Sequence, residues 1–344
     1  MIKRRLVALV YCLLGSILLV LSLHYISNQV RHSRNSFIRL LPSHIVLPGN
    51  ILDLRRSGWR FSGISDDSLY LGNFYVPDKI LKVSKDIKDT ISVKLNFPNN
   101  VKLTQTYFNS VDNGSVYTFD GSQPALFKSN LINGQLKIKA KPPFFTQAIH
   151  SCNNSYVLRV VLNGQNTLVN YNSDSTGLRI PIGLLEKQVD GVFCTDGNLI
   201  KVPNSNRIFY IYYYRNQFIC ADKKLTLLYK GKTIDTVSKA KIKVAYIKSQ
   251  NQTTLAIPPV YVNKQSTAND KYLFIHSGLK ADNEVGGTLD KLSVIDVYQV
   301  TDGRYKFSFY LPDFNGKKLT DFRAYGKNLY ALYDHYLYKY QLNF

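Results

Sequence analysis

Short apolar runs, separated by turn residues, dominate the chain beyond residue 59. The run IFYIYYY at 208–214 is one, and the runs at 272–275 and 329–333 also place apolar side chains at successive positions. Because successive side chains of a strand point to opposite faces, such runs need cover on both faces. A two-sheet sandwich leaves one face of each sheet in water, whereas each blade of a β-propeller packs between two neighbours. No long segment has the 3.6-residue period of a helix, so the pattern predicts an all-β propeller.

The runs repeat at a spacing typical of four-stranded blades. The first three repeats start roughly 43 residues apart, and later ones are stretched by insertions. We predict six four-stranded blades within residues 57–344, with five or seven as alternatives. The last repeat has three clear strands, so we expect residues 52–56 or 59–61 to complete it and close the ring. The predicted first strands of the six blades are 59–62, 102–107, 144–149, 189–194, 260–263 and 318–325.

An apolar segment near the N-terminus predicts one membrane span. Residues 6–23 contain no charged side chain, and eighteen residues of helix are just long enough to cross a bilayer core. A cleavable signal peptide is the alternative, but the segment ends in Leu23-His24-Tyr25-Ile26, which is a poor cleavage site. We therefore expect a basic cytoplasmic tail (1–5), an uncleaved transmembrane anchor (6–23) and a juxtamembrane stalk (24–56).

The orientation of this span follows from the charges beside it. Lys3, Arg4 and Arg5 precede the span, and a short basic tail is retained in the cytoplasm while large C-terminal domains cross the membrane regardless of charge. We expect a single-pass protein of the inner (cytoplasmic) membrane with its C-terminal domain in the periplasm.

The net charge of +21 would by itself favour a nucleic-acid partner. Residues 1–60, however, hold nine Lys or Arg and one Asp, which leaves a net of 8 charges beside the membrane. The remaining 13 are spread over a long β domain in which lysines recur in nearly every repeat. Topology and anionic lipid headgroups explain the basic stretch, so we expect no nucleic-acid partner.

Two motifs resemble known propeller repeats. Asp67-Ser68-Leu69-Tyr70-Leu71-Gly72-Asn73 opens the repeats, and residues 322–332, FRAYGKNLYAL, close them. Over residues 59–344 the chain resembles bacterial extracytoplasmic six-bladed propellers of the TolB-like or NHL-like type, especially membrane-anchored members. The resemblance implies a fold and an address; its motifs carry no catalytic group.

Residues suited to catalysis or metal binding are sparse. His150, His276 and His335 have no metal-ligand spacing, and Glu186 and Glu284 are the only glutamates. We therefore predict no catalytic residues, no metal and no cofactor. The cysteines at 152, 194 and 220 are expected to be buried and unpaired, because the strands predicted to carry the last two lie too far apart for a disulfide.

Loop positions give the candidate ligand site. In a four-stranded blade, the turn between the second and third strands and the link to the next blade emerge on one face, around the channel mouth. Amides and carboxylates there suit a sugar, a peptide or a cation. The function predicted is a binding or scaffold module in a cell-envelope complex, with an envelope protein, peptide or glycan as partner; the alternative is a lactonase-like or glycosidase-like hydrolase. The predicted ligand-binding residues are Asp78, Asn163, Asn166, Arg215, Asn216, Asp282, Glu284, Asp334 and His335.

Overall fold

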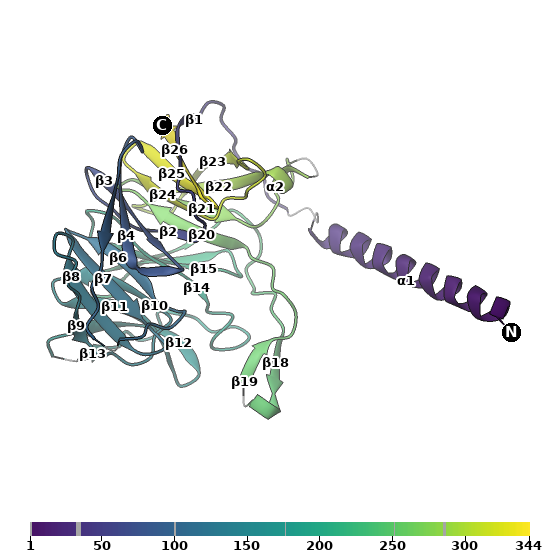
Figure 1. The fold of residues 1–344 in the computed structure, drawn as a ribbon, viewed down its shortest axis with the longest axis horizontal. Coiled ribbons are helices and arrows are strands. Elements are labelled where there is room, and N and C mark those ends of the chain that lie inside the picture. Colours follow the sequence, from purple (N-terminus) through teal and green to yellow (C-terminus); the bar gives the residue numbers. More distant parts are fainter. Residues whose placement is uncertain (1, 32–35, 100, 176, 251, 285–286) are drawn as a thin grey trace.

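The protein is a six-bladed β-propeller preceded by one apolar helix (Figure 1). The computed structural model describes residues 2–31, 36–99, 101–175, 177–250, 252–284 and 287–344. Within them, six four-stranded antiparallel sheets surround a central axis, and the first strands of neighbouring blades contact one another around it. The predicted fold class is therefore confirmed.

Five blades are continuous in the sequence, and their strands follow one another in chain order. Blades 1 and 2 consist of β2 (Trp59–Ile64), β3 (Ser68–Asn73), β4 (Val76–Ser84), β5 (Thr90–Lys94), β6 (Phe108–Asp112), β7 (Ser115–Asp120), β8 (Ala125–Asn130) and β9 (Lys137–Ala140). Blades 3 and 4 consist of β10 (Gln147–Cys152), β11 (Ser155–Leu162), β12 (Gln165–Asn172), β13 (Leu178–Arg179), β14 (Gly197–Lys201), β15 (Arg207–Tyr212), β16 (Gln217–Asp222) and β17 (Leu227–Lys232). Blade 5 consists of β20 (Asn263–Ala268), β21 (Tyr272–Ser277), β22 (Leu292–Gln299) and β23 (Tyr305–Pro312).

Blade 6 closes the ring with strands from both ends of the chain. It combines β24 (Asp321–Tyr325), β25 (Asn328–Tyr333) and β26 (Tyr336–Leu342) with β1 (Val46–Asp53). β1 lies antiparallel to β26, with Val46 opposite Leu342 and Leu52 opposite Leu337. We expected residues 52–56 or 59–61 to close the ring. The closing strand β1 lies mostly before residue 52, and residues 59–61 belong to β2, the first strand of blade 1. Part of the expected stalk thus belongs to the propeller.

The apolar runs have both faces covered, as their pattern required. On β15, Phe209 and Ile211 pack into a cluster shared with blade 5. The side chains that alternate with them, Ile208, Tyr210 and Tyr212, pack into a cluster shared with blade 3. A single strand thus contributes to two hydrophobic layers, one on each side of its blade.

Two first strands lie wholly beyond their predicted ranges. We predicted 102–107 and 189–194; the strands are β6 and β14. First strands border the polar channel, so they carry residues such as Asn109 and Asn198 and lack a dense apolar run. In blade 2 the apolar residues before the strand, Val101 and Leu103, pack against the core from a loop.

An insertion separates blades 4 and 5. Part of it forms a hairpin of β18 (Val244–Ile247) and β19 (Gln252–Leu255), with the short 3-10 helix η1 (Lys248–Gln250) between them. The hairpin projects from the body of the propeller (Figure 1). The fourth strand of blade 4 is β17, so the chain between it and β20 belongs to no blade.

Strand direction defines two faces of the propeller. Since neighbouring strands are antiparallel, the turns between second and third strands and the links between blades lie on one face. The described residues that follow the helix α1 (Ile2–Arg31) begin at this face. Phe37 packs there against Leu279 and Ala281, in the link between β21 and β22, and its carbonyl accepts a hydrogen bond from the Asp282 N–H at 2.8 Å. We call this side the anchor face and the opposite side, with the turns after each first strand, the distal face.

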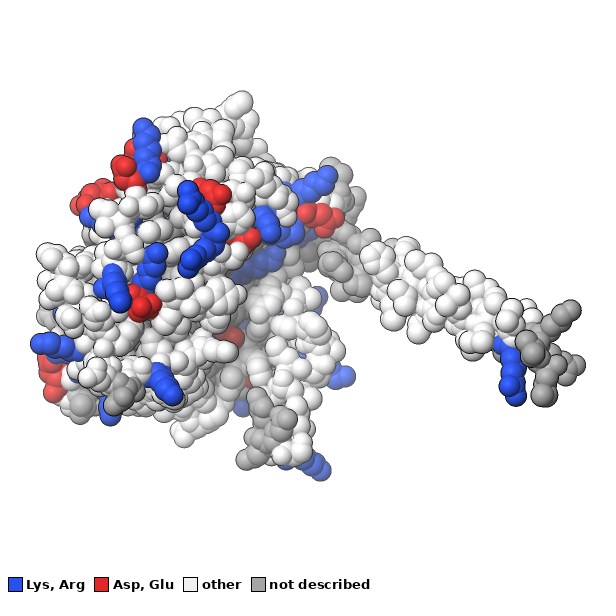
Figure 2. Space-filling view, in the orientation of Figure 1, with Lys and Arg blue, Asp and Glu red and all other residues white. Residues whose placement is uncertain are grey.

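The helix α1 stands away from the propeller (Figure 1). Within Arg5–Ile26, an 18-residue window has a mean hydropathy of 2.7, and by length and composition this helix can cross a membrane or serve as a signal sequence. Lys and Arg are scattered over the propeller and interspersed with Asp and Glu on the side seen in Figure 2.

Candidate functional site

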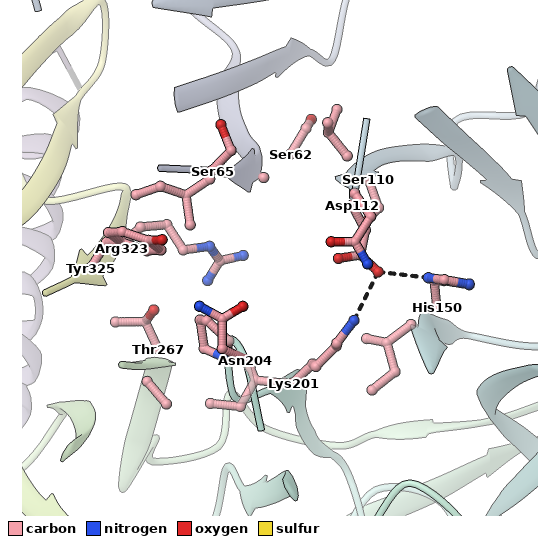
Figure 3. Close-up of a pocket in the computed structure, with 18 of the residues that line it drawn as sticks. Ser62, Ser65, Ser110, Asp112, His150, Lys201, Asn204, Thr267, Arg323 and Tyr325 are labelled. Atoms are coloured by element: carbon pink, nitrogen blue, oxygen red, sulfur yellow. Dashed lines mark hydrogen bonds and ion pairs between the residues drawn. The ribbon is translucent and has the colours of Figure 1, made fainter. Parts of the chain in front are cut away.

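A polar cavity of about 360 Å³ lies on the propeller axis at the distal face. The first strands of all six blades contribute to its wall through their last residues or the turns that follow, and Figure 3 shows these side chains around a common space. Its volume is in the range of small-molecule sites. Polar members of the wall include Ser62, Ser65, Ser110, Asn204, Thr267 and Arg323.

One wall holds a chain of polar and charged groups from blades 2, 3 and 4. The Asp112 Oδ2 lies 2.8 Å from the Lys201 Nζ and 2.6 Å from the His150 Nδ1 (Figure 3). Burial alone would raise the pKa of Asp112, but the hydrogen bonds with His150 and Lys201 lower it to about 2. Asp112 is therefore ionised at neutral pH and fixes the position of the Lys201 ammonium group.

The His150 ring supports this wall from behind. Its Nε2 lies 2.9 Å from the Asn153 carbonyl oxygen, and the ring stacks on Tyr117 with centroids 4.4 Å apart. Both ring nitrogens are thus occupied by neighbouring oxygens. The arrangement makes His150 a positioning group for Asp112 and leaves no free nitrogen to act as a base in the cavity.

Arg323 extends from β24 on another side of the cavity. Its guanidinium points into the middle of the space, above the Asn204 amide in Figure 3. Nearby, the Tyr325 hydroxyl donates a hydrogen bond to Asp66. This bond raises the pKa of Tyr325, and the Lys85 Nζ lies 3.4 Å from the Tyr325 ring centroid.

The nine predicted ligand-binding residues lie in or beside turns and links of the anchor face, as we expected. None of them lines the distal cavity, so their role in ligand binding stays a prediction. Asn163 and Asp282 are exposed, and Asp78 and His335 are partly exposed. The Asp334 carboxylate lies 3.1 Å from the Lys317 Nζ.

The other four predicted residues are buried and hold the fold together. The amides of Asn166 and Asn216 donate to the carbonyl oxygens of Val192 and Asp235, at 2.7 and 2.6 Å. The Arg215 guanidinium lies 3.7 Å from the centroid of the Tyr212 ring. The remaining one, the Glu284 carboxylate, is fully buried and accepts a hydrogen bond from Arg39 at 2.6 Å.

The cysteines are unpaired in the structure. Cys194 and Cys220 are buried, as expected, and burial raises the pKa of the Cys220 thiol to about 11. Cys152 differs from our expectation because it is exposed at the turn after β10. Among the described residues, no group of three or more His, Cys, Asp or Glu is placed to bind a metal ion.

Comparison with known proteins supports the fold. No protein-family model and no curated protein matches the sequence. A solved member of the DUF4221 family from Bacteroides vulgatus is similar over 90% of this chain and 99% of its own, with a TM-score of 0.53 and 12% identity. A solved Bacteroides fragilis protein with the name "putative exported protein" has a TM-score of 0.48 and 9% identity. The likeness covers 90% of this chain and 95% of that protein's chain. The first of these likenesses shows the fold alone, and the finer resemblance to TolB-like or NHL-like propellers stays a prediction.

The predicted ligand-binding residues belong to the anchor face, and the distal cavity was not predicted. A signal for the cavity exists, because several first strands end in, or lead into, a polar side chain. The residues concerned are Asp66, Asp112, His150, Lys201, Thr267 and Arg323. Recognising this repeat requires the correct limits of β6 and β14, which the apolar pattern did not give.

Proposed function

We propose that this chain is a membrane-attached, extracytoplasmic binding module whose ligand occupies the distal cavity. One observation carries the proposal: six first strands bring polar side chains to one cavity on the axis, although the first and the last of these strands are more than 250 residues apart in the sequence. Hydrogen-bonding groups gathered in a concave site are typical of ligand binding. The ligand we propose comes from the cell envelope, such as a peptide, a glycan or a segment of an envelope protein.

The topology of the propeller suits this role. The uncleaved helix α1 holds the anchor face toward the cytoplasmic membrane, with Lys3, Arg4 and Arg5 in the cytoplasm. The distal cavity then opens away from the membrane and is accessible to molecules of the envelope. A scaffold role in an envelope complex is compatible with the same arrangement.

A propeller hydrolase is the weaker proposal. A lactonase-like or glycosidase-like site would be supported by carboxylates from four blades meeting near the axis. Among the described residues, the cavity carboxylates are Asp66 and Asp112, from blades 1 and 2. The hydrogen bonds and ion pairs of Asp112 with Lys201 and His150 account for it as part of the wall.

Filling the distal cavity should abolish ligand binding. A screen of envelope peptides and sugars against the full chain in detergent micelles should give ligands that raise its melting temperature, because a ligand at 100 times its Kd stabilises a protein by about 2.7 kcal/mol. Ser110→Trp places an indole where Figure 3 shows the Ser110 side chain directed into the cavity. We expect the same ligands to leave its melting temperature unchanged.

The matched control is Ser92→Trp, on the exposed edge strand β5 of blade 1. It should respond to the ligands as the unmodified protein does. Equal shifts in the Ser110→Trp variant would place the binding site elsewhere, and a screen that yields no ligand would count against the binding function.

A membrane-impermeant maleimide should label the protein at Cys152 alone. Cys152 is exposed near the distal face, Cys194 and Cys220 are buried, and Cys12 lies within the proposed span. We expect labelling in cells with a permeable outer envelope and an intact cytoplasmic membrane, and none in the Cys152→Ser variant. Labelling that begins only after the cytoplasmic membrane is lysed would reverse the topology.

A further inference from the structure

Arg323 places a cation at the centre of the distal cavity (Figure 3). It is half-buried, and within the part of the chain that the structure describes no carboxylate forms an ion pair with it. A partly buried charge without an ion-pair partner is available to an incoming anion, which would lie in the reduced dielectric of the cavity. The guanidinium also presents planar, paired N–H donors that match a carboxylate or phosphate group.

The rest of the cavity wall favours the same ligand charge. Lys201 contributes a second cation, 21% exposed and oriented by Asp112, whose negative charge is paired with Lys201 and whose Oδ2 also lies 2.6 Å from the His150 Nδ1. Lys223, in the turn after β16, is a further basic residue of the wall. The other carboxylate of the wall, Asp66, accepts the Tyr325 hydroxyl hydrogen bond. Among the described residues, three Lys or Arg and two Asp thus line the cavity, and each of the two carboxylates already has a partner inside the protein.

Uncharged hydrogen-bonding groups surround these cations. Asn204 lies beside the Arg323 guanidinium, and Ser65, Ser110 and Thr267 border the same space (Figure 3). Hydroxyl and amide groups can bind the neutral, polar part of a ligand while the cations bind its charged end. A charged group on a polar body therefore fits the wall better than a purely apolar ligand.

We propose that the distal cavity binds a small ligand through a carboxylate or phosphate group, held by Arg323 together with Lys201. This inference rests on the proposed binding function and adds the chemical class of the ligand. A sugar acid and a phosphorylated molecule share the required charge, so the test has an arm for each.

The test measures binding by calorimetry with the full chain in detergent micelles. The probes are sodium glucuronate, inorganic phosphate and, as the neutral counterpart of the first, glucose, all at one ionic strength set with sodium chloride. We expect at least one anion to bind, glucose to bind more weakly, and Arg323→Gln to weaken anion binding roughly tenfold or more. Arg323→Lys keeps the charge and loses the paired donors. Its affinity for the anion should lie between those of the unmodified protein and Arg323→Gln.

The matched control is Arg304→Gln, which removes an equal charge from a side chain that is 83% exposed in the turn after β22. It should bind as the unmodified protein does, and Arg323→Lys serves as the second variant if Arg323→Gln does not fold. Preference for glucuronate or for phosphate distinguishes the two sources of the anion. Unchanged affinity in folded Arg323→Gln, or binding of glucose alone, overturns the inference and leaves the binding function standing; a cavity that binds neither these probes nor any ligand of the screen overturns both.

Discussion

Replacing Arg39 by methionine is expected to lower the free energy of unfolding by about 3–5 kcal/mol, the cost of removing one partner from a buried ion pair. Arg39 is 2% exposed. Its Nε lies 2.8 Å from the Asp296 Oδ1 and its Nη1 lies 2.6 Å from the Glu284 Oε2. Without the guanidinium, two buried carboxylates face each other with no cation between them. Fluorescence of Trp59, the single tryptophan, reports unfolding in denaturant.

The control for this variant is Arg304→Met, which removes an exposed ion pair with Asp302 and should cost no more than about 1 kcal/mol. The double variant Arg39→Met with Glu284→Gln removes one of the unpaired charges and should recover part of the loss. Equal stability of Arg39→Met and the unmodified protein would show that the ion pairs do not hold the segment around Arg39 to the propeller.

Replacing residues 46–53 with a Gly–Ser linker of equal length should abolish cooperative unfolding of the propeller. The change keeps α1 and the chain length but removes β1, the outer strand of blade 6. β26 would lose the backbone hydrogen bonds of one edge, and Leu52 would no longer cover the cluster around Leu337. Because each blade is stabilised by both neighbours, the loss at blade 6 opens the ring between blades 6 and 1. Circular dichroism and Trp59 fluorescence should then report broad, separate transitions.

The control replaces residues 244–247 with a Gly–Ser linker of equal length. This replacement removes β18, which pairs with β19 in the projecting hairpin. The hairpin is a separate two-stranded sheet and belongs to no blade. The main transition should stay sharp and shift little. If the variant without β1 also unfolds in one sharp transition at an unchanged midpoint, the closing strand contributes nothing essential.

The sequence predicted the blades well where strands are buried on both faces. β15, β21 and β25 are dense apolar runs, and their positions match the prediction closely. First strands were harder because they border a polar channel. β6 reads FNSVD and β14 reads GNLIK, so neither stands out from a loop by composition. The closing strand β1 also escaped, because most of its residues are exposed and it contains Pro48 and Gly49.

The distal cavity could not be found from the sequence without the correct limits of the first strands. Asp112, Lys201 and Arg323 lie far apart in the chain, and no spacing rule connects them. What brings them together is the common direction of the first strands, which turns all six of their ends toward one face. Similarly, nothing near Arg39 in the sequence indicates that its partner is Glu284, 245 residues later.

The position of Arg39 between α1 and β1 determines how the propeller would bear mechanical load. If α1 is fixed in a membrane, tension on the chain reaches Arg39 before it reaches Val46. The ion pairs with Glu284 and Asp296 pass that force into blade 5, together with the hydrogen bond from the Ser308 N–H to the Leu40 carbonyl at 2.7 Å. The closing strand β1 therefore bears less of the force. A pull on α1 must break the buried ion pairs of Arg39 before it can separate β1 from β26.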